Sequence, residues 1–410
     1  MRPQRKILIV VVDGLGDRAI RELDWKTPLQ CANRPNLNWY AENGVNGLMD
    51  VIAPGVRPGS DTSHLAILGY DPYQVYTGRG PFEAAGIGLI GQKGDVAFRC
   101  NFATIDERGN IVDRRAGRIK QPETTELISS LSNLKIGDVE IIVKEATEHR
   151  AVLLLRGEGL SPFVTDVDPH ESSMIQECMP LVPEATKTAE IVNKFVEESR
   201  RILSTHPINL RRRKEGKPEA NVILPRGAGT FPDIQSLEEK YGLSAACVAG
   251  VSLVKGICRI CGMEVANVPG ATGGIDTDMI AKAECVVRLL ESKDLVLLNV
   301  KATDIASHDG DFRKKIEIIE RVDSMIGYLR NSIPSETVVA ILADHCSPIE
   351  VRDHSGDPVP VTIYCESGIR DTVEQFDEPS FLRGGLGRIR GKDLMPILLD
   401  KANRSKKFGA

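Results

Sequence analysis

Short apolar runs of strand length recur along the chain and alternate with longer amphipathic stretches. The strand-like runs cover residues 6–12, 294–300, 337–343 and 358–364. Their apolar residues are continuous and rich in Val and Ile, which is typical of parallel strands buried on both faces. The stretches 185–203 and 310–329 carry apolar residues at helical spacing, so we expect helices that cover such a sheet. The pattern predicts an α/β fold.

The middle of the chain has a different pattern. Its strand-like runs are shorter, and turn signals occur at residues 106–110 and 156–159. At 410 residues the chain also exceeds the length at which one hydrophobic core usually stops growing. We therefore predict a discontinuous catalytic domain formed by residues 1–90 and 181–410, and a smaller inserted α+β domain formed by residues 91–180.

Composition and charge exclude several classes of protein. Charged residues make up 27% of the chain and the formal net charge is −5, which indicates neither a nucleic-acid partner nor a membrane surface. The apolar run near the N-terminus ends at Asp13, which is too early for a signal segment or a membrane span. Nine cysteines in a chain of this length do not form the pattern of a disulfide framework, so we expect a reducing cytoplasm.

Two short motifs resemble functional sites, but the surrounding sequence favours structural explanations for both. Cys258 and Cys261 have the spacing of metal ligands, but no second pair follows, and buried cysteines are the favoured interpretation. Residues 86–91 fit the glycine pattern of a dinucleotide-binding loop. No strand run precedes them, so we interpret them as a link into the inserted domain.

Aspartates follow three of the predicted strands. Asp13 and Asp344 come directly after residues 6–12 and 337–343, and Asp304 comes a few residues after 294–300. Because the carboxyl ends of parallel strands lie at one edge of a sheet, we expect these three acids to converge. For any one of them taken alone, a helix N-cap is the favoured explanation.

Three of the seven histidines lie in the same segments as these acids: His308, His345 and His354. Asp304 and His308 are four residues apart, which would put them on one side of a helical turn. Carboxylates gathered in a partly buried crevice require a compensating cation, and mixed Asp and His ligands suit Mn²⁺, Zn²⁺ or Mg²⁺. His354 alone could belong to a turn, but the recurrence favours a metal site.

A polar cluster at residues 57–70 suggests a nucleophile. Ser60 follows a Pro-Gly turn and begins a predicted helix, where free backbone N–H groups favour an anion. A nearby divalent cation would lower the pKa of the hydroxyl, which makes Ser60 a candidate phosphoryl acceptor. A simple helix cap is the alternative. His64 either shapes the turn or takes part in catalysis.

Five segments together resemble a known family. Residues 11–14, 58–72, 301–311, 343–348 and 353–361 are similar, in order, to motifs of the archaeal-type cofactor-independent phosphoglycerate mutases of the alkaline phosphatase superfamily. The resemblance implies an alkaline-phosphatase-like sheet sandwiched by helices. It also implies that the chain interconverts 3-phosphoglycerate and 2-phosphoglycerate, in glycolysis and gluconeogenesis, without a bisphosphoglycerate cofactor.

The resemblance further implies two divalent metal ions and a phosphoserine intermediate. Asp13, Ser60, Asp344 and His345 would hold one ion. Asp304, His308 and His354 would hold the other, and Ser60 would carry the phosphoryl group. Mn²⁺ is the expected ion, with Zn²⁺, Mg²⁺ and Co²⁺ as alternatives.

Phosphoryl transfer depends on positioning and charge neutralisation, so we expect basic residues around the substrate. The candidates, Arg99, Arg115, Arg118, Arg150, Arg226 and Lys255, come mostly from the inserted domain and the strand after it. Lys255 is also a candidate catalytic residue. Asp168 and His170 are expected to contact the glycerate hydroxyls, with Asp168 as a candidate base. A solvated salt-bridged surface is the alternative for each single arginine.

A metal-dependent phosphatase or phosphodiesterase is the alternative function, because the same nucleophile and metals would serve hydrolysis. The two functions differ in whether water or a glycerate hydroxyl attacks the phosphoserine. The expected partner is the small phosphoglycerate substrate, and the sequence leaves open whether the chain forms a homo-oligomer.

Overall fold

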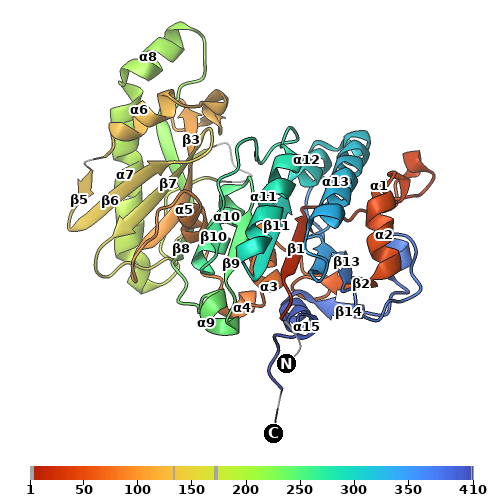
Figure 1. Ribbon diagram of the computed structural model, residues 1–410. Helices are drawn as coiled ribbons and strands as arrows, with labels where there is room; N and C mark the ends of the chain where they lie inside the picture. Colours follow the sequence, from red (N-terminus) through yellow and green to blue (C-terminus); the bar gives the residue numbers. More distant parts are fainter. Residues whose placement is uncertain (1–3, 133, 170–173, 408, 410) are drawn as a thin grey trace. The chain divides into compact units, whose positions relative to one another are not determined.

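The computed structural model describes residues 4–132, 134–169, 174–407 and 409. The chain divides into two compact units, drawn in Figure 1: Met1–Tyr76 with Ile234–Ala410, and Thr77–Asp233. The second unit is wider than the inserted domain expected at 91–180. Helix α5 (Gly80–Gly86) before that range, and helix α7 (Thr186–Ser204) with strand β8 (Val222–Thr230) after it, pack on the sheet of the second unit.

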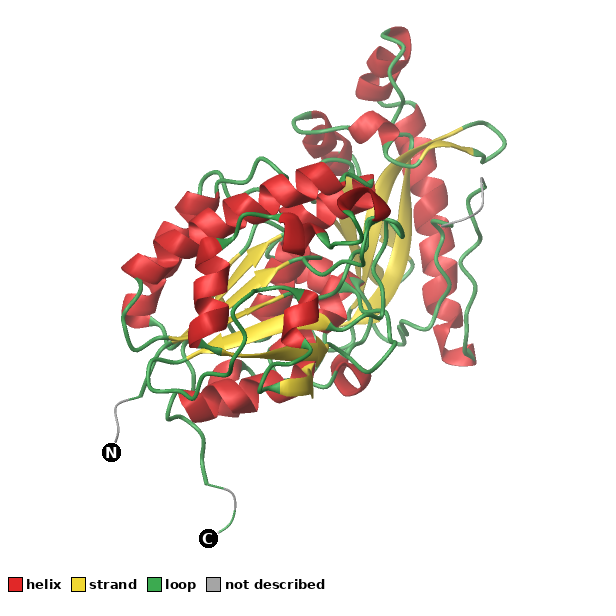
Figure 2. Cartoon of the chain, turned by 90° about the vertical axis from the view of Figure 1, so that its right-hand side faces the viewer, coloured by secondary structure: helices red, strands yellow, loops and turns green. Residues whose placement is uncertain are grey.

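The first unit is built on a mixed sheet. Within the described residues it has eight strands in the order β10-β9-β11-β1-β12-β13-β2-β14. Their bounds are Glu264–Val265 (β10), Ala245–Val248 (β9), Leu295–Val300 (β11), Ile7–Val12 (β1), Val338–Leu342 (β12), Val359–Tyr364 (β13), Val45–Asp50 (β2) and Gly387–Arg390 (β14). Helices lie on both faces of this sheet (Figure 2), which confirms the expected α/β architecture.

The middle strands of this sheet are parallel and fully buried. β1 pairs in parallel with β11 and with β12, and every residue of β1 is at most 1% exposed. The continuous apolar runs therefore arise as predicted. The prediction of a parallel strand at 358–364 is wrong, because β13 pairs antiparallel with both β12 and β2. An apolar run does not encode strand direction, since either direction buries the same side chains.

The helices of the first unit include α3 and α12, which contain the candidate residues Ser60, Asp304 and His308. Their bounds are Pro28–Cys31 (α1), Pro35–Asn43 (α2), Ser60–Ile67 (α3), Pro72–Val75 (α4), Leu237–Tyr241 (α9), Ser252–Ile260 (α10), Met279–Ser292 (α11), Ala302–Asp309 (α12), Phe312–Ser332 (α13), Glu378–Phe381 (α14) and Leu394–Lys401 (α15). Among the described residues no helix combines the length and the apolar character needed to cross a membrane.

The second unit has its own antiparallel sheet and its own core. The strand order is β4-β3-β7-β6-β5, and β8 pairs with β3. The bounds are Ile111–Asp113 (β4), Val96–Ile105 (β3), Arg150–Arg156 (β7), Val139–Glu145 (β6) and Lys135–Ile136 (β5), and the further helices are Glu123–Ser129 (α6) and Pro207–Lys214 (α8). Phe98, Phe102 and Phe195 lie in one buried apolar cluster of this unit.

The two weaker motifs have structural roles. Cys258 lies on α10 and Cys261 directly after it, and both thiols are buried and free. Residues 86–91 begin at Gly86, the last residue of α5, so they end a helix instead of opening one. This excludes a dinucleotide-binding loop, which opens a helix after a strand. The interpretation as a link into the inserted domain is wrong, because the second unit already begins at Thr77 and the segment lies inside it.

Candidate functional site

The register of three parallel strands brings the candidate metal ligands to one edge of the first sheet. Val12 of β1 pairs with Val300 of β11, and Val11 pairs with Leu342 of β12. The residues that follow these strand ends therefore meet: Asp13, the helix α12 with Asp304 and His308, and the pair Asp344 and His345. Ser60 begins α3, and His354 lies in the loop before β13. Among these ligands and Ser60, only His308 is exposed.

One group of side chains surrounds His345. Its Nε2 atom lies 3.4 Å from Asp13 Oδ1, 3.3 Å from Asp344 Oδ2 and 3.2 Å from Ser60 Oγ. All four side chains are buried, and each presents an oxygen or nitrogen lone-pair atom to the others. This is the set that the family resemblance implied for one cation.

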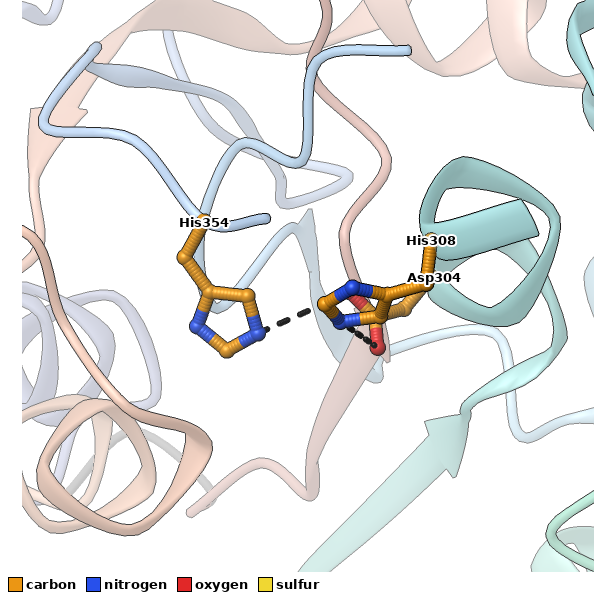
Figure 3. A group of neighbouring side chains, drawn as sticks. All are labelled: Asp304, His308 and His354. Atoms are coloured by element: carbon orange, nitrogen blue, oxygen red, sulfur yellow. Dashed lines mark ion pairs between the residues drawn. The ribbon is translucent and has the colours of Figure 1, made fainter. Parts of the chain in front are cut away.

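A second group surrounds Asp304 (Figure 3). Its Oδ2 atom lies 3.3 Å from His308 Nε2, and its Oδ1 atom lies 3.7 Å from His354 Nε2. The two groups are adjacent, because the rings of His345 and His354 stack with centroids 3.5 Å apart. Asp304 also has one carboxylate oxygen within 4.8 Å of ligand atoms of Asp13 and His345, so it could serve either cation.

The orientation of all three histidines suits metal binding. Nδ1 of His308 lies 2.7 Å from the carbonyl oxygen of Arg352, and Nδ1 of His354 lies 2.8 Å from that of Pro58. Nδ1 of His345 lies 3.0 Å from Ser347 Oγ. Ser347 donates its own proton to Asp304 Oδ1, at 2.6 Å, so His345 Nδ1 is the donor in that pair. In each ring the Nε2 atom is directed to the carboxylates, as in metal sites.

The imidazoles and the Lys301 ammonium interact electrostatically with the acids of this centre. The hydrogen bond with Asp304 raises the pKa of His308 to about 9. Burial lowers the pKa of His345, but the charges of Asp344 and Asp13 outweigh burial and hold it above its ordinary value. Burial raises the pKa of Asp13, yet Lys301 and His345 bring it down to about 2. A divalent ion bound here would compete with protons for the imidazole nitrogens.

A further observation supports the binding of divalent cations by these Asp and His side chains. Asp344 Oδ2 is buried and has no hydrogen-bond partner among the described residues. A buried carboxylate oxygen without a partner is costly, and a cation is the usual partner for it. Three carboxylates with three imidazoles match the ligand preferences of Mn²⁺ and Zn²⁺ better than those of Ca²⁺.

The second unit contains a separate cavity of about 400 Å³ that is lined mainly by cations. Its lining residues are Arg99, Asn101, Arg114, Arg115, Arg118, Glu148, His149, Arg150, Asp168 and Arg226. The five arginines that we predicted to bind substrate all belong to this lining. They come from β3, β7, β8 and the turn after β4, so the antiparallel pairing of these strands gathers them.

The cations of this cavity lack enough counter-charge. Arg99 Nε and Arg150 Nε are buried and have no hydrogen-bond partner among the described residues. Burial and the nearby Arg79 lower the pKa of Arg99 to about 9. Burial and Arg150 lower the pKa of His149 to about 4. Such a cluster of mutually repelling cations with open donors is built for an anion.

Asp168 is the buried acid of this cavity. Its carboxylate accepts hydrogen bonds from Arg114 at 2.9 Å, Asn101 at 3.1 Å and Arg226 at 3.4 Å. This network orients two arginines, and the role of base remains a prediction. Lys255 lies on α10, which packs against α3, the helix that begins at Ser60. His170 lies outside the described residues.

Sequence reasoning missed several polar residues of the first unit. Lys301 directs its ammonium to Asp13 and Asp304, Ser347 holds His345, and Asn299 Nδ2 lies 3.4 Å from both Asp13 Oδ2 and His64 Nε2. His64 is fully buried, with Nδ1 2.7 Å from the carbonyl oxygen of Ser60, so it supports the turn. Lys301 and Ser347 lie in the segments 301–311 and 343–348, which the sequence analysis had already selected. Their closeness in sequence to the predicted ligands was the signal that could have identified them.

Comparisons with known proteins find similar chains over nearly the whole length. The family profile of 2,3-bisphosphoglycerate-independent phosphoglycerate mutase matches residues 41–209. A protein of that name from Methanopyrus kandleri is 51% identical over 416 residues, which cover 99% of each chain. A solved protein from Pyrococcus horikoshii has a TM-score of 0.88 and 43% identity over the full length of both chains. A solved cofactor-independent phosphoglycerate mutase from Thermoplasma acidophilum has a TM-score of 0.72 and 42% identity, covering 97% of this chain and 100% of its own.

Proposed function

Since the chain belongs to the 2,3-bisphosphoglycerate-independent phosphoglycerate mutases, we propose that it moves the phosphoryl group between the two glycerate hydroxyls through Ser60. The observation that carries this proposal is the position of Ser60 Oγ, 3.2 Å from His345 Nε2, beside two adjoining sets of carboxylates and imidazoles. An isolated serine hydroxyl is a weak nucleophile at neutral pH, so it needs such surroundings to react with a phosphate ester.

Asp13, Ser60, Asp344 and His345 hold one divalent cation in this proposal, and Asp304, His308 and His354 hold a second. Bound there, the cations would lower the pKa of the Ser60 hydroxyl and neutralise charge on the transferring phosphoryl group. Mn²⁺ is the proposed ion, with Zn²⁺, Mg²⁺ and Co²⁺ as alternatives. Asp344 Oδ2, which is buried and makes no hydrogen bond among the described residues, supports the need for a cation on an observation independent of the family.

The reaction conserves the phosphoryl group in two displacements. Ser60 Oγ attacks the phosphorus of 3-phosphoglycerate and loses its proton, while the bond to the 3-oxygen breaks and that oxygen gains a proton. The 2-hydroxyl then attacks the phosphoserine, loses its proton and restores the serine hydroxyl. Both displacements need the nucleophile and the leaving oxygen in line.

The arginine cavity of the second unit binds the anionic groups of the substrate in this proposal. Arg99 and Arg150 each have a buried Nε atom without a hydrogen-bond partner among the described residues, although Glu83 lies 3.8 Å from that of Arg99. The Asp168 network fixes Arg114 and Arg226. Planar guanidinium groups bind carboxylate and phosphate in a bidentate manner. Lys255 is proposed as a further cation near Ser60, since α10 packs against α3. A cytoplasmic location and a homo-oligomeric state remain predictions.

The test is to supply 3-phosphoglycerate with Mn²⁺, quench in acid, and identify products and the modified peptide by mass spectrometry. Wild-type protein should yield 2-phosphoglycerate and carry one phosphoryl group on the peptide that contains Ser60. Ser60→Ala should yield neither. Ser63→Ala is the matched control on the same helix, because Ser63 is fully buried and its hydroxyl has no hydrogen-bond partner among the described residues.

Two results would contradict the proposal. Free phosphate as the main product would indicate a phosphatase, because water would then have reached the phosphoserine. Full activity of protein stripped by a chelator, with no gain on adding Mn²⁺, would remove the metal role.

A further inference from the structure

Lys301 directs its ammonium into the middle of the carboxylates of the first unit. It follows β11 directly and precedes α12, and its side chain is 21% exposed. Its Nζ atom lies 2.8 Å from Asp13 Oδ1, 2.7 Å from Asp304 Oδ2 and 3.4 Å from Ser60 Oγ. The three donors of the ammonium thus have three partners, which are two of the candidate ligands and the candidate nucleophile.

The ammonium contacts the same oxygens that face the imidazoles. Asp13 Oδ1 also lies 3.4 Å from His345 Nε2, and Asp304 Oδ2 also lies 3.3 Å from His308 Nε2. One oxygen of each proposed ligand set is therefore shared with Lys301. A positive charge on these oxygens compensates the buried acids, and it opposes any further cation that binds to them.

We propose that Lys301 is an internal cation of this centre. It holds Asp13 and Asp304 together while divalent ions are absent, weakens the binding of those ions, and contacts the phosphoryl group on Ser60 during transfer. The last two parts rest on the proposed function, whereas the first part follows from the contacts alone.

Charge balance supports the contact with the phosphoryl group. Three aspartates and a phosphoserine of about −2 charge offset two divalent cations and leave one negative charge. The ammonium of Lys301 brings this sum to zero. A phosphoryl group on Ser60 Oγ would have its oxygens near a point charge that already lies 3.4 Å from that atom.

The experiment compares Lys301→Met, Lys301→Arg and the control Lys293→Met. Lys293 also forms an ion pair, 2.6 Å from Glu264, but it does so away from the ligands in the same unit. Three quantities are measured: the unfolding temperature of metal-free protein, Mn²⁺ affinity by calorimetry, and the rate of phosphoserine formation in a single turnover at saturating Mn²⁺.

Lys301→Met should unfold at a lower temperature without metal, because the acids then repel each other without compensation. It should bind Mn²⁺ about 10-fold more tightly and form phosphoserine about 100-fold more slowly, the effect typical of losing one charge-stabilising donor. Lys301→Arg should retain the metal-free stability. If Lys301→Met folds only in the presence of Mn²⁺, that result also supports the inference.

If Lys301→Met and Lys293→Met have the same metal-free stability and the same Mn²⁺ affinity, the inference is overturned. The proposed function is then still intact. Tighter Mn²⁺ binding with an unchanged rate of phosphoserine formation would overturn the contact with the phosphoryl group. Wild-type protein that needs no divalent ion would instead overturn the metal role in the proposed function. The failures of the two proposals are therefore distinguishable.

Discussion

Single hydrogen bonds determine which nitrogen of each histidine is directed to the carboxylates. The carbonyl oxygens of Arg352 and Pro58 hold Nδ1 of His308 and His354, while a side chain, Ser347, holds Nδ1 of His345. Main-chain acceptors persist under substitution, so only the third contact can be removed. Ser347 also donates to Asp304 Oδ1, and it thereby links the two ligand sets. At the residue scale, Ser347 is the most informative position next to the ligands.

Ser347→Ala should lower Mn²⁺ affinity by about 10- to 100-fold, because His345 and Asp304 lose the group that orients them. It should also lower the free energy of unfolding of metal-free protein by about 1–3 kcal/mol, since two buried polar groups lose a partner. Calorimetric titration with Mn²⁺ and denaturant unfolding measure the two effects. Ser199→Ala, which removes a buried serine hydroxyl of α7 in the second unit, is the control. Equal Mn²⁺ affinities in the two variants would refute this role for Ser347.

The turn that ends β1 determines how closely the ligand-bearing elements approach each other. Gly14 has a φ of +65°, and its N–H donates to Asp344 Oδ1 at 3.2 Å. A Cβ atom at this position would lie 2.8 Å from both Asp304 Cβ and Ser347 Oγ. The end of β1 thus packs directly on α12 and on the loop after β12. At the element scale, a residue without a side chain is what lets three strand ends converge.

Gly14→Ala should disrupt this approach far more than Gly55→Ala does. Gly55 has a similar φ of +75°, but nothing lies within 4 Å of the place of its Cβ atom. Both variants pay the cost of a left-handed alanine, about 1–2 kcal/mol. Only Gly14→Ala should also displace Asp304, so its unfolding free energy should fall by several kcal/mol and its Mn²⁺ affinity should drop. Chemical denaturation and calorimetry of both variants give the comparison, and equal losses of stability would exclude the steric effect.

Each of the two units holds a different part of the chemistry. The carboxylates and imidazoles belong to the first unit, Met1–Tyr76 with Ile234–Ala410, and the arginine cavity belongs to the second, Thr77–Asp233. Each unit has its own sheet, and the second has its own apolar cluster. At the scale of the whole molecule, the proposed cation site and the arginine cavity therefore belong to units with different sheets.

Mn²⁺ should protect the first unit selectively against amide hydrogen exchange. At 100 times its dissociation constant a ligand adds about 2.7 kcal/mol to the stability of the state that binds it. Peptides from β1, β11, β12 and α12 should exchange more slowly with Mn²⁺, whereas peptides from β3, β6 and β7 should not change. Mass spectrometry resolves the peptides, and equal protection of both units by Mn²⁺ would contradict a metal site confined to the first.

The sequence alone determined the α/β class, the buried strands and the candidate ligands, because continuous apolar runs and short motifs are local signals. Asp13 and Asp344 directly follow two predicted strands, so the sequence predicted that they meet at one edge of the sheet. Parallel strands place their carboxyl ends at the same edge wherever they pair. Tertiary structure decided the direction of β13, the extent of the second unit and the partners of Asp168 and Lys301. These depend on which strands pair and how closely distant segments approach. A lysine three residues before an acid reads in the sequence as an ordinary surface pair until folding brings its ammonium to Asp13, which follows a different strand.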